Sequence, residues 1–222
     1  MNYGSVFQTW RDATPIWSAY TNHAFVKGLG DGTLPTAMFL HYLKQDYVFL
    51  IHFARAWALA ITKADTVAEM RLAASTVNGL INEEIALHIK TCADAGIDEV
   101  ALFATQERAA NLAYTRYVLD AGHSGDLLDL LAALAPCVMG YGEIGTSLET
   151  SKTSEKYTDW IKVYAGDDYQ QVCRDVGALV DAAVTRRLGN HPQSSPRWAT
   201  LLARFEMATK LEIGFWDMGL TP

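Results

Sequence analysis

Apolar residues recur at helical spacing along nearly the whole chain, and this pattern most constrains the fold. The clearest run extends from Pro35 to about Lys63, and another begins near Leu127 and reaches about Glu149. Side chains three or four residues apart lie on one face of a helix, so these runs predict long helices with buried faces. No stretch alternates apolar and polar residues as a half-buried strand does. The sequence therefore predicts an all-α protein.

The remaining helices are expected from the same spacing. Three glycines within five residues, Gly28, Gly30 and Gly32, predict a turn before the helix that starts at Pro35. Pro136, which cannot donate a backbone hydrogen bond, is expected to bend the helix that contains it. The other helices are expected over residues 7–20 with a bend at Pro15, over 66–95, 99–120, 153–164 and 168–188, and after the loop 189–196.

Composition excludes several classes of protein. Half of the 222 residues are hydrophobic and 19% are charged, so the chain is not disordered, and charged residues interrupt the apolar runs short of the roughly 20 residues needed to span a bilayer. Met1 to Tyr20 contains no basic start followed by an apolar region, so no export signal is expected. These features predict a soluble cytoplasmic protein with no membrane partner.

The net charge and the cysteine content argue against a nucleic-acid partner, a disulfide framework and a cysteine zinc site. The net charge is -7 and no cluster of lysine and arginine occurs, so nucleic acid is not an expected partner. The three cysteines, Cys92, Cys137 and Cys173, form no CxxC pair, which predicts free thiols with neither a disulfide framework nor a cysteine zinc site.

Two carboxylic side chains occur in apolar surroundings. Asp46 lies three residues before Phe49 on the aromatic face of its helix, and Glu212 lies three residues before Phe215. A carboxylate in such a place has to be hydrogen-bonded or paired, so a second buried group or a ligand is expected to meet Asp46. Cys137 shares a helix face with Tyr141, although a lone cysteine is ordinarily a small buried hydrophobe.

Glu84 and His88 are spaced to share a metal ion on one helix face. Di-iron bundles need matching glutamate and histidine contributions from other helices, and no second set at that spacing is present. The favoured interpretation is an ordinary intrahelical pair of Glu84 with His88.

Five segments, taken in order, carry a resemblance to a known family. They are HAFVKGLGDGTLP at 23–35, QDYVFL at 45–50, Pro136-Cys137 followed by Tyr141, Tyr157-x-x-Trp160-Ile161 with Tyr164, and EIGFW at 212–216. The chain resembles, over essentially its whole length, the TenA family of thiaminase II (aminopyrimidine aminohydrolase) enzymes, in the class that contains an active-site cysteine.

The resemblance implies a single-domain helical bundle over residues 1–222, of the haem-oxygenase-like type, assembled as a homotetramer. It implies no metal and no organic cofactor. The implied activity is hydrolysis of 4-amino-5-aminomethyl-2-methylpyrimidine to the hydroxymethylpyrimidine and ammonia in thiamine salvage, with cleavage of thiamine as a further reaction.

The resemblance also implies roles for individual residues. Cys137 matches the nucleophile that adds to the pyrimidine ring, Glu212 the acid that protonates the ring, and Asp46 a carboxylate that hydrogen-bonds the nitrogen-bearing edge of the substrate. The substrate pocket is expected to be lined by Tyr114, Tyr141, Tyr164, Phe49 and Phe215.

The chain departs from the family pattern at Phe49, where many members carry a tyrosine whose hydroxyl supports the cysteine. This departure keeps open an alternative function, namely a non-catalytic pyrimidine-binding or regulatory protein that has kept the pocket. A haem or di-iron protein of the same fold is a further alternative, which metal analysis and a visible absorption spectrum would test.

Overall fold

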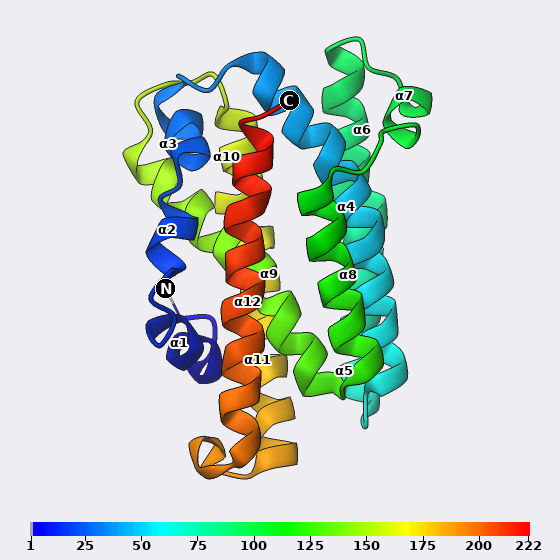
Figure 1. Cartoon of the computed structure of the whole chain (residues 1–222), viewed down its shortest axis with the longest axis vertical. Coiled ribbons are helices and arrows are strands. Elements are labelled where there is room, and N and C mark those ends of the chain that lie inside the picture. Colours follow the sequence, from blue (N-terminus) through cyan, green and yellow to red (C-terminus); the bar gives the residue numbers. More distant parts are fainter. Residues whose placement is uncertain (1) are drawn as a thin grey trace.

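The computed structural model of the protein describes residues 2–222, which form helices and contain no strand. The helices α4, α8 and α12 run side by side along the long axis of the molecule (Figure 1). The all-α prediction is confirmed. The long helices are α4 (Thr36–Lys63), α8 (Ala109–Ser124), α9 (Leu127–Ser151), α11 (Asp167–Leu188) and α12 (Pro196–Gly219).

Shorter elements connect and cover these long helices. They are α1 (Ser5–Asp12), α2 (Trp17–Thr21), α3 (Ala24–Asp31), α5 (Val67–Gly79), the π-helical turn η1 (Leu80–Glu84), α6 (Ile85–Asp94), α7 (Glu99–Phe103), α10 (Thr158–Ala165) and the 3₁₀ turn η2 (Pro192–Ser194).

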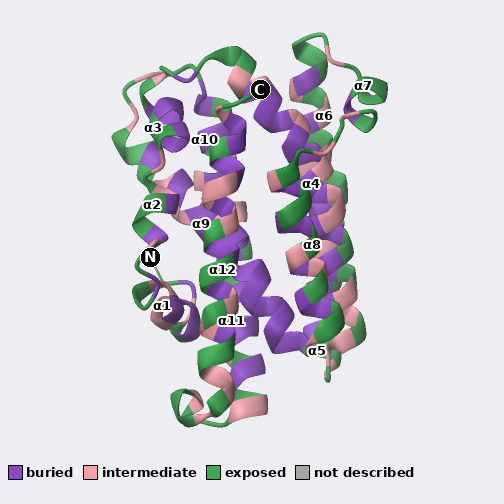
Figure 2. Cartoon of the chain, in the orientation of Figure 1, coloured by how far each residue is buried: buried purple, intermediate pink, exposed green. Residues whose placement is uncertain are grey.

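The helix α9 forms the centre of the bundle and contacts α8, α10, α11 and α12. It begins at a capping box, in which Asp126 accepts the backbone N–H of Asp129 while the Asp129 side chain accepts the backbone N–H of Asp126. The helix continues through Pro136 to Ser151. It is long and apolar enough to cross a membrane, but 94% of its most apolar window is buried, as is typical of the core helix of a soluble protein. Its dense burial is visible in Figure 2.

The N-terminal segment differs from its expected form in two places. The expected helix over 7–20 is two helices, because the chain leaves the helical path around Pro15, a residue that disfavours helical geometry in the residue before it. The expected turn before the helix that starts near Pro35 is present between α3 and α4, but Gly28 and Gly30 lie inside α3 and do not form it. A Cβ atom at Gly30 would lie 2.9 Å from the Leu148 side chain, so this glycine allows α3 to approach α9. Only Gly32, with φ of 76°, makes the turn.

Two further expected helices are interrupted. The run over 66–95 is divided by the π-helical turn η1 into α5 and α6. The run over 99–120 is broken between α7 and α8, where the Gln45 side chain donates to the backbone oxygen of Gln106 and accepts the backbone N–H of Arg108. These bonds satisfy backbone groups that a continuous helix would have paired internally.

Candidate active site

A cavity of about 650 Å³ opens between α4, α5, η1, α9 and the junction of α10 with α11. Four residues expected at the site line it, namely Asp46, Phe49, Cys137 and Tyr141. They come from α4 and α9, which are far apart in the sequence. The structure therefore brings together side chains that helical spacing alone could not place near one another.

Cys137 is 8% exposed on α9, and its thiol interacts with the carboxyl group of Glu212 on α12. Burial, together with the nearby Glu212 charge, raises the pKa of the Cys137 thiol well above its ordinary value. The thiol is therefore protonated at neutral pH and needs a base before it can act as a nucleophile.

Glu212 is 1% exposed, and burial raises the pKa of its carboxyl group to about 8. The Tyr114 hydroxyl donates a hydrogen bond to Glu212 Oε1 over 2.8 Å. Burial raises the pKa of Tyr114 well above its ordinary value, so this phenol stays a donor. The Cys137 thiol and the Glu212 carboxyl therefore form a pair that can exchange a proton, held in place by a phenol.

Asp46 has the buried partner that its surroundings required. His88 Nε2 lies 2.7 Å from Asp46 Oδ2, and the Tyr42 hydroxyl donates to the same oxygen over 3.0 Å. Burial opposes the charged imidazolium, but the hydrogen bond and the charge of Asp46 outweigh burial and raise the pKa of His88. His88 and Tyr42 thus hold in place the Asp46 side chain, which lines the cavity.

Glu84 and His88 interact within the helical run, as the sequence interpretation expected, but their hydrogen bond uses the Glu84 backbone and not its carboxyl group. His88 Nδ1 lies 2.9 Å from the backbone oxygen of Glu84, whereas the Glu84 carboxylate accepts a hydrogen bond from the Tyr164 hydroxyl over 3.0 Å. The need of Asp46 for a buried partner was the signal that could have identified His88.

Glu84 is a second cavity carboxyl group that the sequence did not single out for the site. It lines the cavity together with Cys137 and Asp46, and burial raises its pKa to about 7. Tyr164, which donates to Glu84, packs against Tyr141 with ring centroids 4.9 Å apart.

The aromatic residues form a wall in two layers. Phe49 lines the cavity, and Phe215 and Tyr114 pack behind it with ring centroids 5.4 Å and 5.0 Å away. Phe215 therefore supports the wall from behind and is not among the lining residues. Tyr164 likewise lies behind the lining residues, where it contacts Glu84 and Tyr141.

Within residues 2–222, no group of three or more histidine, cysteine, aspartate or glutamate side chains is placed to hold a metal ion. Cys92, Cys137 and Cys173 are all buried free thiols.

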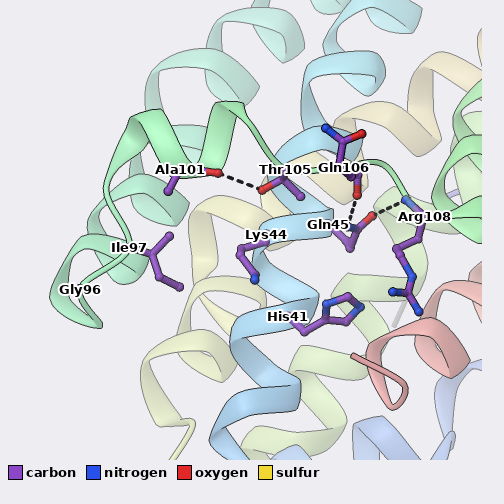
Figure 3. Close-up of a pocket in the computed structure, with 9 residues that line it drawn as sticks. All are labelled: His41, Lys44, Gln45, Gly96, Ile97, Ala101, Thr105, Gln106 and Arg108. Atoms are coloured by element: carbon purple, nitrogen blue, oxygen red, sulfur yellow. Dashed lines mark hydrogen bonds between the residues drawn. The ribbon is translucent and has the colours of Figure 1, made fainter.

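A smaller pocket of about 440 Å³ lies on the other side of α4, where His41, Lys44 and Arg108 line it (Figure 3). It contains Gln45, whose amide is occupied in holding the segment between α7 and α8. No thiol or carboxyl group lines this pocket. The chemistry expected from the sequence therefore lies in the larger cavity.

Comparison with known proteins agrees with this geometry. The sequence profile of the TENA/THI-4/PQQC family matches residues 10–221. The chain belongs to this family. Among proteins similar to this TENA/THI-4/PQQC chain, an uncharacterized protein of Haemophilus influenzae is 40% identical over 213 residues, covering 95% of this chain and 96% of the relative. An aminopyrimidine aminohydrolase of Halalkalibacterium halodurans is 36% identical over 209 residues, covering 93% of this chain and 91% of the relative.

Solved structures show the same fold. A protein of Silicibacter sp. TM1040, described as a TenA family transcription regulator, superposes with a TM-score of 0.98 at 62% identity, covering 99% of this chain and 98% of that one. A domain of unknown function from Shewanella denitrificans with a heme oxygenase-like fold superposes with a TM-score of 0.72 at 12% identity, covering 96% of this chain and 90% of that one. The resemblance to TenA proteins and the haem-oxygenase-like fold are therefore confirmed.

Proposed function

We propose that this TENA/THI-4/PQQC chain is a hydrolase of thiamine salvage that converts 4-amino-5-aminomethyl-2-methylpyrimidine to 4-amino-5-hydroxymethyl-2-methylpyrimidine and ammonia. The observation that carries the proposal is the pairing of the Cys137 thiol with the Glu212 carboxyl beside a cavity that Asp46 also lines. The aminopyrimidine aminohydrolase at 36% identity supports the substrate class. Cleavage of thiamine itself is proposed as a second reaction.

The proposed reaction uses one proton that moves between two residues. Glu212 accepts the proton of the Cys137 thiol, and the sulfur adds to a carbon of the pyrimidine ring. Glu212 then returns the proton to a ring nitrogen, while Asp46 holds the nitrogen-bearing edge of the ring. The addition interrupts the aromatic ring and lets the exocyclic nitrogen leave, after which water adds to the methylene carbon. Loss of the ring proton and of the C–S bond restores the thiol.

The test is release of ammonia from the aminomethylpyrimidine by the purified protein. Cys137→Ser should abolish the release, because a serine hydroxyl is a much poorer nucleophile than a thiolate. Unchanged activity of this variant would overturn the cysteine mechanism. A parallel assay on thiamine measures which substrate is preferred.

A non-catalytic pyrimidine-binding or regulatory protein is the second candidate function. Phe49 brings no hydroxyl group to the cavity, and burial leaves the Cys137 thiol with a strongly raised pKa. The description of the 62% identical Silicibacter protein as a transcription regulator fits this candidate. Tight binding of the hydroxymethylpyrimidine without any ammonia release would favour it, and restored release in Phe49→Tyr would locate the defect at the missing hydroxyl.

A further inference from the structure

The cavity is lined by far more acidic than basic groups. Only Lys162 among its lining residues carries a permanent positive charge. The acidic lining residues are Asp46, Glu83, Glu84, Asp167, Asp168 and Asp175. Clefts lined by charges of one sign concentrate ligands of the opposite sign. The lining is therefore suited to a ligand that carries a positive charge.

Glu84 is the acidic group best placed to meet that charge inside the cavity. It ends the π-helical turn η1, a type of turn that is frequent at functional sites. Its Oε1 atom accepts the Tyr164 hydroxyl, which fixes the direction of the carboxyl group. Burial raises its pKa to about 7, so a neighbouring cation would favour the ionised form.

Asp46 and Glu84 are linked on one side of the cavity through His88. The imidazole contacts the Asp46 carboxylate through Nε2 and the Glu84 backbone oxygen through Nδ1. In the proposed substrate, the amino group that Asp46 would bind and the aminomethyl group that leaves are on neighbouring ring carbons. A ring held by Asp46 therefore directs its aminomethyl group toward the neighbouring carboxyl group.

On the basis of the proposed function, we propose that Glu84 is a specificity-determining residue, whose carboxylate binds the ammonium form of the substrate's aminomethyl group. The enzyme then selects pyrimidines whose leaving group is a cation. The hydroxymethyl product is neutral and is bound less tightly, which favours its release.

The ammonium form is also the better leaving group, because it departs as a neutral molecule. The C–N bond breaks with its electron pair going to nitrogen, so an ammonium substituent leaves as neutral ammonia. Water supplies a hydroxyl group to the methylene carbon and a proton to the ammonia. The net change is an ammonium substituent and water giving the neutral alcohol and an ammonium ion.

The test compares two ligands that differ in one group, measured by calorimetry on Cys137→Ser protein so that neither is turned over. The ligands are the aminomethylpyrimidine and the hydroxymethylpyrimidine. A charge-assisted hydrogen bond predicts that the aminomethyl ligand binds about tenfold more tightly or better. Adding Glu84→Gln should remove this preference by weakening the aminomethyl ligand alone. Glu206→Gln, the same change at an exposed position of α12, is the matched control and should keep the preference.

The outcomes distinguish failure of the proposed role of Glu84 from failure of the proposed function. If Glu84→Gln weakens both ligands equally, or neither, the specificity role is overturned even though the wild-type protein releases ammonia. If the wild-type protein releases no ammonia, the proposed function fails instead. Should Glu84→Gln not fold, Glu84→Asp keeps the charge, and loss of the preference in a folded Glu84→Asp protein that still binds the neutral ligand contradicts the role.

Discussion

Cys137 and Glu212 titrate as a pair, because each buried side chain shifts the pKa of the other. In the reactive form, the Cys137 thiol is protonated and the Glu212 carboxylate is not. Glu212 then takes the proton from the thiol. When both groups are protonated, no base is available to Cys137. The pKa of Glu212, about 8, therefore controls how much reactive pair is present.

The first prediction concerns this pH dependence. We expect kcat/KM for ammonia release to rise as the pH approaches 8, because Glu212 must lose its proton before it can act as the base for Cys137. Glu212→Gln should lower kcat/KM by about 10²–10⁴-fold and remove this limb of the profile. A profile that instead falls between pH 6 and pH 8 would contradict the assignment of Glu212 as the base for Cys137.

The second prediction concerns His88, which positions Asp46. His88→Ala removes the partner that lies 2.7 Å from Asp46 Oδ2 and leaves this buried carboxyl group with the hydrogen bond from the Tyr42 hydroxyl. We expect KM to rise about tenfold, equivalent to the loss of one charge-assisted hydrogen bond, with a smaller change in kcat. Steady-state kinetics measure both constants. A loss confined to kcat would show that His88 acts on the chemical step and not on substrate binding.

At the scale of helices, α9 is held to α12 by a buried charge at its first turn. Asp129 is 1% exposed, and its carboxylate lies 2.6 Å from Arg204 Nε and 2.7 Å from a terminal nitrogen of Arg197. Burial alone would raise the pKa of Asp129, but hydrogen bonds from Arg197, the Asp126 backbone and Arg204 outweigh it and hold the pKa below its ordinary value. This contact therefore fixes the register of the helix that carries Cys137 against the helix that carries Glu212.

The third prediction follows from this contact. Asp129→Ala should lower the free energy of unfolding by about 3 kcal/mol, because a buried carboxylate with two arginine partners is lost. Asp12→Ala, which removes an exposed partner of Arg11, is the control and should cost less than about 1 kcal/mol. Urea unfolding at pH 7 measures both, and equal values for the two variants would contradict the role of Asp129.

Because its pKa is low in the folded protein, Asp129 should also make the free energy of unfolding decrease as the pH falls. Its stabilisation is fully present above the unfolded pKa of about 3.9 and is lost as the pH falls through the lower folded value. Asp129→Asn should therefore reduce the loss of stability between pH 5 and pH 2 when the same urea measurement is repeated across that range.

Helix ends were less predictable from sequence than helix faces, for physical reasons. Packing overrides local preference at Gly30, whose glycine serves close contact with Leu148 and not a turn. A side chain from another helix, Gln45, fixes the break between α7 and α8, and no local pattern reveals that contact.

In the site, likewise, features of one helix could be predicted from the sequence, whereas contacts between helices could not. Asp46 was recognisable as a buried carboxylate that needs a partner, because its neighbours on the helix face are aromatic. The identity of the partner depended on the π-helical turn before α6, which decides where His88 points. That Cys137 meets Glu212 depends on how α9 packs against α12, which periodicity within one helix cannot determine.

For the whole molecule, the fourth prediction is its assembly as a homotetramer, which the family resemblance implies. Large apolar side chains remain exposed on the single chain, including Val100 at 78% and Phe103 at 79% on α7. Exposed apolar groups of this kind are frequent at interfaces between chains. Four chains of 24.5 kDa give a mass of about 98 kDa. Light scattering on the eluting protein measures this mass, and a value near that of one chain would refute the tetramer.

The π-helical turn Leu80–Glu84 makes the active site sensitive to the length of the chain as well as to its residues. A π-helical turn already holds one residue more than an α-helical path needs, so losing one residue there would restore an α-helix without turning α6, whereas inserting another would rotate α6 by about 100° relative to α5. His88 would then point away from Asp46. Substitutions at the exposed positions Ile81 and Asn82 leave this rotation unchanged. In a library of natural or random variants, Ile81 and Asn82 should therefore accept many changes of residue, whereas this segment should accept no inserted codon.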